Sequence, residues 1–169
     1  MKKIMIFVLS AVLLLSMTAC ACTGGQTVPG NTPAPNPTEA PDPINTDALA
    51  DIMTAILKDA PIEAATGESA VEAERFSWIF GIEPVKGAEG YSSEAMINAI
   101  AHSVALLRVP EGTDAAEIAK QIEDQADPRK WICVEAEKKI VKQRGNVVLL
   151  VMSTADVADA VAQAFDNYQ

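Results

Sequence analysis

Residues 147–152 read Val-Val-Leu-Leu-Val-Met and give the strongest strand signal in the chain. Successive side chains of a strand point to opposite faces, so this run is apolar on both faces. Such a strand belongs in the interior of a sheet, where neighbouring elements bury both of its faces. A turn at 144–146 precedes it, and Ser153 or Thr154 is placed to cap a helix after it.

Further elements follow from the residues around this strand. Residues 102–109 form a compact apolar strand that ends at a Pro-Glu-Gly turn, and residues 89–96 are its predicted hairpin partner. Apolar side chains recur at helical spacing in four other segments, which lie at 45–57, 69–80, 114–126 and 154–168. A further strand is predicted in the region 131–143, and it forms a second pair with the strand at 147–152. The order predicts an α+β fold in which a small antiparallel sheet of about four strands has helices packed on one face.

The N-terminus has the pattern of an export signal. Lys2 and Lys3 precede an apolar run at 4–16, which is shorter than the ~20 residues that span a bilayer. The sequence Ser-Met-Thr-Ala-Cys at 16–20 resembles the bacterial lipobox, with Met17 where Leu is usual. The resemblance implies a lipoprotein signal peptide at 1–19 and a diacylglyceryl group on Cys20, although an ordinary cleaved signal that releases the protein is the alternative.

A linker separates the signal from the domain. Residues 20–44 hold the predicted lipidated cysteine and six of the ten prolines, and their apolar residues show no periodicity. This composition is typical of a disordered spacer with polyproline II character. We therefore predict that it tethers a single domain, residues 45–169, to the outer face of a cell membrane.

The net charge of the chain limits the classes of partner that it can bind. The formal net charge is −10, and removal of a signal that carries two lysines and no acid makes the mature chain more negative still. Such a surface repels nucleic acid phosphates and anionic headgroups. We expect no nucleic acid partner, and contact with the membrane only through the lipid on Cys20.

Few residues suggest catalysis. The chain has one histidine, no recognisable phosphate-binding or metalloprotease motif, and three cysteines, of which only Cys133 lies in the domain. The sequence predicts no metal and no cofactor. Cys133 and His102 are the one candidate nucleophile and base, but a cysteine between Ile132 and Val134 is more typical of a small buried apolar residue.

One cluster is a candidate ligand patch. Arg129, Lys130 and Trp131 place two cations beside an indole in an acidic chain, which suits an anionic group or a sugar ring. The alternative is structural: Arg129 and Lys130 pair with nearby acids such as Asp127 and Glu135, while Trp131 closes the end of the core.

Residues 91–165 resemble the bacterial lipoproteins that carry a DUF4358 domain, a domain of unknown function. The residues that carry the resemblance are His102-Ser103-Val104, Leu107-Arg108-Val109, the block 127–134 and Gly145-Asn146-Val147-Val148-Leu149. The resemblance implies an anchored extracytoplasmic domain and no particular activity.

Two functions are therefore compatible with the sequence. The first is a non-enzymatic binding or accessory domain for a protein or another envelope component. The second is a hydrolase or transferase that acts on cell-wall material or peptides through Cys133 and His102. We expect the first, because the sequence has an anchor and a spacer but no further catalytic set.

Overall fold

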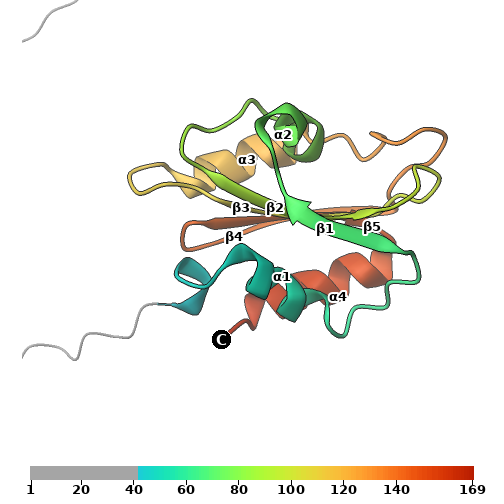
Figure 1. Ribbon diagram of the computed structural model, residues 1–169, viewed down its shortest axis with the longest axis horizontal. Coiled ribbons are helices and arrows are strands. Elements are labelled where there is room, and N and C mark those ends of the chain that lie inside the picture. The colour runs from blue at the N-terminus through green and yellow to red at the C-terminus, as the bar shows by residue number, and fades with distance from the viewer. Residues whose placement is uncertain (1–41) are drawn as a thin grey trace, which may run out of the picture. The chain divides into compact units, whose positions relative to one another are not determined.

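The strand predicted from residues 147–152 lies inside a five-stranded antiparallel sheet of order β1-β2-β3-β5-β4 (Figure 1). This computed structural model describes residues 42–169. The elements in chain order are a 3₁₀ helix Pro43–Asn45, α1 Leu49–Leu57, β1 Thr66–Ala70, α2 Ala73–Phe80, β2 Glu89–Ala95, β3 Ser103–Arg108, α3 Ala115–Gln125, β4 Lys138–Arg144, β5 Val147–Ser153 and α4 Ala155–Asp166. The α+β class and the antiparallel sheet are confirmed. The predicted signal peptide, Cys20 and the tether up to residue 41 lie outside the described residues.

Helices cover both faces of the sheet. α2 and α3 lie on one face, and α1 and α4 lie on the other (Figure 1). The prediction that helices pack on one face is therefore wrong, because a strand that is apolar on both sides needs cover on both. The side chains of β5 alternate between two cores, with Val148, Leu150 and Met152 in one and Val147, Leu149 and Val151 in the other.

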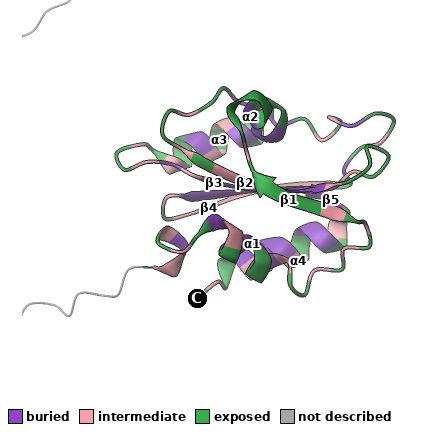
Figure 2. Cartoon of the chain, in the orientation of Figure 1, coloured by how far each residue is buried: buried purple, intermediate pink, exposed green. Residues whose placement is uncertain are grey.

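The helices turn their apolar stripes toward these cores (Figure 2). In α4, Val157, Val161 and Phe165 are buried, as their spacing predicts. The predicted helix at 114–126 corresponds to α3, which is capped by the Asp114 carboxylate: this group accepts hydrogen bonds from the backbone N–H groups of Ala116 and Glu117 at 3.0 and 3.1 Å.

The fifth strand was not predicted. β1 occupies part of the segment expected to be helical from residue 69, and α2 begins only at Ala73. Four of the five β1 residues are exposed, so the strand has no apolar alternation to reveal it. The end of α2 is as expected: Gly81 has φ 75°, and a Cβ atom there would meet the Ala126 backbone at 2.6 Å.

The domain begins upstream of the predicted boundary at Asn45. Ile44 is fully buried in the α1/α4 core. Asp42 accepts two hydrogen bonds from the Arg144 guanidinium, at 2.7 and 2.8 Å, and Asn45 Oδ1 accepts one from the Asn146 N–H at 2.9 Å. These contacts attach the start of the described chain to the turn between β4 and β5. Its proline-rich composition is that of the tether, which concealed the boundary.

None of the helices within residues 42–169 has both the length and the apolar character needed to cross a bilayer.

The burial of Ile44 gives a direct test of the revised boundary. Ile44→Ala should lower the free energy of unfolding by about 2–5 kcal/mol, because it leaves a cavity in a closed core. Chemical denaturation measures this. Ile132→Ala is the matched control: Ile132 is 72% exposed, so its loss should change stability by less than about 0.5 kcal/mol. Equal stability of the two variants would place Ile44 in the tether after all.

Candidate functional site

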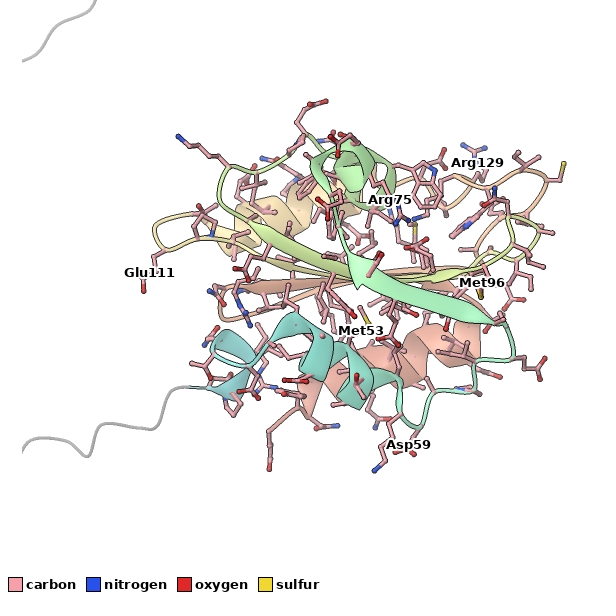
Figure 3. The ribbon with its side chains drawn as sticks, in the orientation of Figure 1. Met53, Asp59, Arg75, Met96, Glu111 and Arg129 are labelled. Carbon is pink, nitrogen blue, oxygen red and sulfur yellow. The ribbon has the colours of Figure 1, made fainter. Side chains whose placement is uncertain are left out.

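One end of the sheet gathers three long connections. The register pairs Thr66 with Ala95, Ser103 with Met152 and Lys138 with Ser153, so the loops 58–65, 96–102 and 126–137 meet there with the β5–α4 junction. Figure 3 places Met96 and Arg129 at this end and Glu111 at the opposite end. The candidate ligand residues at 129–131, together with Cys133 and His102, belong to the loops found at this end.

Trp131 and Arg129 have the structural roles expected of them. The Trp131 side chain is buried in the α2/α3 core, with 7% of its surface exposed. Arg129 is largely exposed and lies 3.5 Å from the Asp127 carboxylate. The three residues therefore do not form one open ligand patch.

Lys130 is enclosed, which the sequence did not indicate. Its side chain is 6% exposed, and its Nζ donates to Ser103 Oγ at 2.9 Å and lies 3.4 Å from Glu94 Oε2. Ser103 in turn donates to Glu94 Oε1 at 2.5 Å. The ammonium also lies 4.0 Å from the ring centroid of Trp78 and 5.1 Å from that of Trp131. The acid that pairs with Lys130 is therefore Glu94, on a distant strand, and not Glu135.

Burial shifts the pKa of both members of this pair. It lowers the pKa of Lys130 to about 8, against the opposing effect of the Glu94 carboxylate. It raises the pKa of Glu94, against the opposing charge of Lys130. Lys130 therefore remains protonated at neutral pH, and each charge needs the other to be tolerated inside the domain.

His102 lies on the other face of β3 from Ser103. It is only 2% exposed, its Nδ1 is 3.0 Å from Ser153 Oγ, and its Nε2 has no hydrogen-bond partner among the described residues. Burial, and then the charge of Lys130, lower the pKa of His102 to about 4. The imidazole is therefore neutral at physiological pH.

The prediction that Cys133 is buried is wrong. It is exposed in the loop before β4, with φ 65° and with an exposed Ile132 beside it. Residues 131–134 are not a strand: Trp131, Val134 and Ala136 pack on the core, whereas Ile132 and Cys133 turn outward. Within residues 42–169 no hydrogen bond joins Cys133 to His102, whose Nδ1 is directed to Ser153.

A cleft opens between these loops and the start of α4. Its volume is about 610 Å³, and His102 and Ser153 lie in its wall. The other lining residues are Pro61, Ile62, Glu63, Ala64, Ile100, Ala101, Glu137, Thr154, Asp156 and Val157. It combines an apolar wall with a few polar groups, which is the usual character of a small-ligand site.

The polar groups of the cleft are mostly acidic. Glu63, Glu137 and Asp156 line it, and the lining contains no lysine or arginine. The Glu137 Oε2 accepts a hydrogen bond from the Ala155 N–H at 3.0 Å, so this carboxylate caps α4 in place of the Thr154 hydroxyl. In the part of the chain that the structure describes, no group of three or more His, Cys, Asp or Glu side chains is arranged to hold a metal ion.

Sequence reasoning did not find this cleft. Its walls come from four segments that are far apart in the chain, and only the sheet register brings them together. The one available signal was His102, a lone histidine that opens an apolar strand. The sequence suggests a role for this histidine only as the base of Cys133.

Comparison of the chain with family models, with curated proteins and with solved structures finds no match. The resemblance to DUF4358 lipoproteins therefore stays a prediction.

The enclosed ion pair gives a second test. Lys130→Ala should lower the free energy of unfolding by about 3–5 kcal/mol, because it leaves the Glu94 carboxylate buried without its counter-ion. Arg129→Ala, which removes an exposed ion pair, should cost less than about 1 kcal/mol. Denaturant melts at pH 7 measure both. The double variant Lys130→Met with Glu94→Gln should regain much of the loss, and its failure to do so would show that the charge pair is not the cause.

Proposed function

We propose that this protein is a lipid-anchored, extracytoplasmic binding domain that takes its ligand, an envelope component or part of a protein partner, into the cleft at the end of the sheet. The anchor rests on the signal and lipobox pattern that ends at Cys20, and on the proline-rich stretch after it. One acyl chain binds a membrane only weakly, whereas the two chains of a diacylglyceryl group hold it stably.

The observation that carries the binding role is the polar arrangement in the cleft. An open space of about 610 Å³ borders a nearly fully buried histidine whose Nε2 has no hydrogen-bond partner within residues 42–169. A buried polar atom left without a hydrogen bond costs about 1–3 kcal/mol, which folding alone does not recover. A hydrogen-bond donor on a bound ligand would satisfy this nitrogen.

The enzymatic alternative has less support. The exposed thiol of Cys133 is the one observation in its favour. Activation would require a base within hydrogen-bonding reach, and His102 is a neutral, buried ring that already bonds Ser153. Binding without catalysis accounts for the same residues with fewer requirements.

The anchor is tested by Cys20→Ala. The variant should move from the membrane fraction to the medium or accumulate as the uncleaved precursor, because the lipobox thiol that accepts the lipid is removed. Cell fractionation and immunoblotting measure this. Cys22→Ala is the matched control and should leave the protein on the membrane. Membrane retention and full processing of the Cys20 variant would contradict the anchor.

The binding role is tested by crosslinking in cells that express the full chain. A benzophenone amino acid at Ile100, a cleft residue that is 38% exposed, should give discrete adducts that the same group at Glu111 does not. Ala64→Trp, which places an indole in the cleft wall, should abolish them. Ala116→Trp, on the exposed surface of α3, should leave them unchanged. The same adducts from both positions, or adducts unaffected by Ala64→Trp, would refute the cleft as a binding site.

A further inference from the structure

The carboxylate that α4 contributes to the cleft differs from the other two carboxylates of this helix. On α4, Asp159 forms an ion pair with Lys138 and Asp166 forms one with Lys142. Asp156, one turn before Asp159 and in the cleft, forms none in the described part of the chain, and neither do Glu63 and Glu137. Three negative charges thus face one space without a cation.

An anionic ligand is disfavoured here. The N-terminus of α4 is the one feature of the cleft that would attract an anion, through its free N–H groups and its dipole. Glu137 already accepts the hydrogen bond from Ala155 N–H at this terminus, and Asp156 adds a second negative charge to the first turn. A further anion would meet repulsion from all three carboxylates.

His102 is an independent observation that favours a cationic ligand. It is nearly fully buried in the wall of the cleft, and its Nε2 has no hydrogen-bond partner in the described part of the chain. When Nδ1 donates its proton to Ser153 Oγ, Nε2 is an acceptor and suits a donor group. The low pKa of His102, about 4, keeps the ring from becoming a competing cation at neutral pH. The nearest enclosed cation that acts on it, Lys130, is neutralised by Glu94.

From these groups we propose that the cleft binds an aliphatic ammonium group, either the side chain of a lysine-like residue in a peptide or a free alkyl amine. The ammonium lies among Glu63, Glu137 and Asp156, and the neutral His102 ring accepts a hydrogen bond when the group reaches it. The carbon chain of the ligand packs on the apolar wall, which includes Ile62, Ile100 and Val157. This inference rests on the proposed binding function and names the ligand class for the same site.

The test uses the full chain in detergent at pH 7 and three probes. They are a blocked tripeptide with a central lysine, its acetylated-lysine counterpart, and pentane-1,5-diamine. Isothermal titration calorimetry should show that the lysyl peptide or the diamine binds at least about tenfold more tightly than the acetylated peptide. Binding of only the diamine would identify a free amine as the source, and binding of only the peptide would identify a side chain. Backbone amide resonances of residues 62–64 and 100–102 should shift on binding.

Two matched variants assign the effect to the cleft. Glu63→Gln combined with Asp156→Asn keeps side-chain size, removes two cleft charges, and should weaken amine binding by about tenfold or more. Glu111→Gln removes one exposed charge at the opposite end of the sheet and should not change it. Circular dichroism checks that each variant is folded.

Several results would overturn the inference. The first is that the acetylated peptide or inorganic phosphate binds as tightly as the amines. The second is that neither amine binds at millimolar concentration. The third is that the variant with both Glu63→Gln and Asp156→Asn binds amines as well as the unchanged protein. Binding of Ca²⁺ that excludes the amines would identify a metal site instead. If any of these occurs while Ile100 still gives cleft-dependent crosslinks, the ligand class is wrong and the binding function stands. Loss of both refutes the function as well.

Discussion

Burial of both faces of β5 is the constraint on which the other elements depend. All seven residues of this strand are buried, and each large apolar side chain contributes about 1.5–3 kcal/mol when it is removed from water. A sheet with one open face would lose about half of this gain, because the side chains on that face would stay in water. Pairs of helices must therefore lie above and below it, α2 with α3 and α1 with α4. The loops that join these layers have to pass around the ends of the sheet, where polar groups can meet water and ligands.

At one end this layered arrangement sets two polar clusters back to back. His102 and Ser103 are neighbours in the chain, but they serve opposite faces of the sheet. Beside Ser103, the buried charges of Lys130 and Glu94 are tolerated because they pair with each other. On the other face, the buried His102 ring is tolerated because its low pKa leaves it uncharged. The two are coupled, because the charge of Lys130 contributes to the low pKa of His102. A cation that serves the core thus helps to keep the ring beside the cleft neutral.

What the sequence revealed depends on how strongly each segment is patterned. β5 and α4 were predictable because every inward position is apolar, and Trp131 was predictable as a large side chain next to a core segment. β1 was not, since it is held by backbone pairing with β2 and shows little side-chain burial. Cys133 was expected to be buried but is exposed, because the backbone turns outward at this residue. Lys130 was expected at the surface but is buried, because it pairs with Glu94, 36 residues earlier in the chain. Such distant pairings, like the walls of the cleft, are set by strand register, which periodicity does not encode.

The attachment of Asp42 and Ile44 beside the β4–β5 turn has a mechanical consequence. The Arg144 guanidinium holds Asp42 at one end of β5, and the cleft begins at Ser153, at the other end. Seven strand residues separate the two by about 20 Å, at roughly 3.4 Å per residue. Tension transmitted along the upstream chain therefore loads the turn and the strand it feeds, in the direction of the strand axis. The cleft lies beyond the far end of that axis, so an opposing force applied by a bound ligand would be carried along the length of the strand.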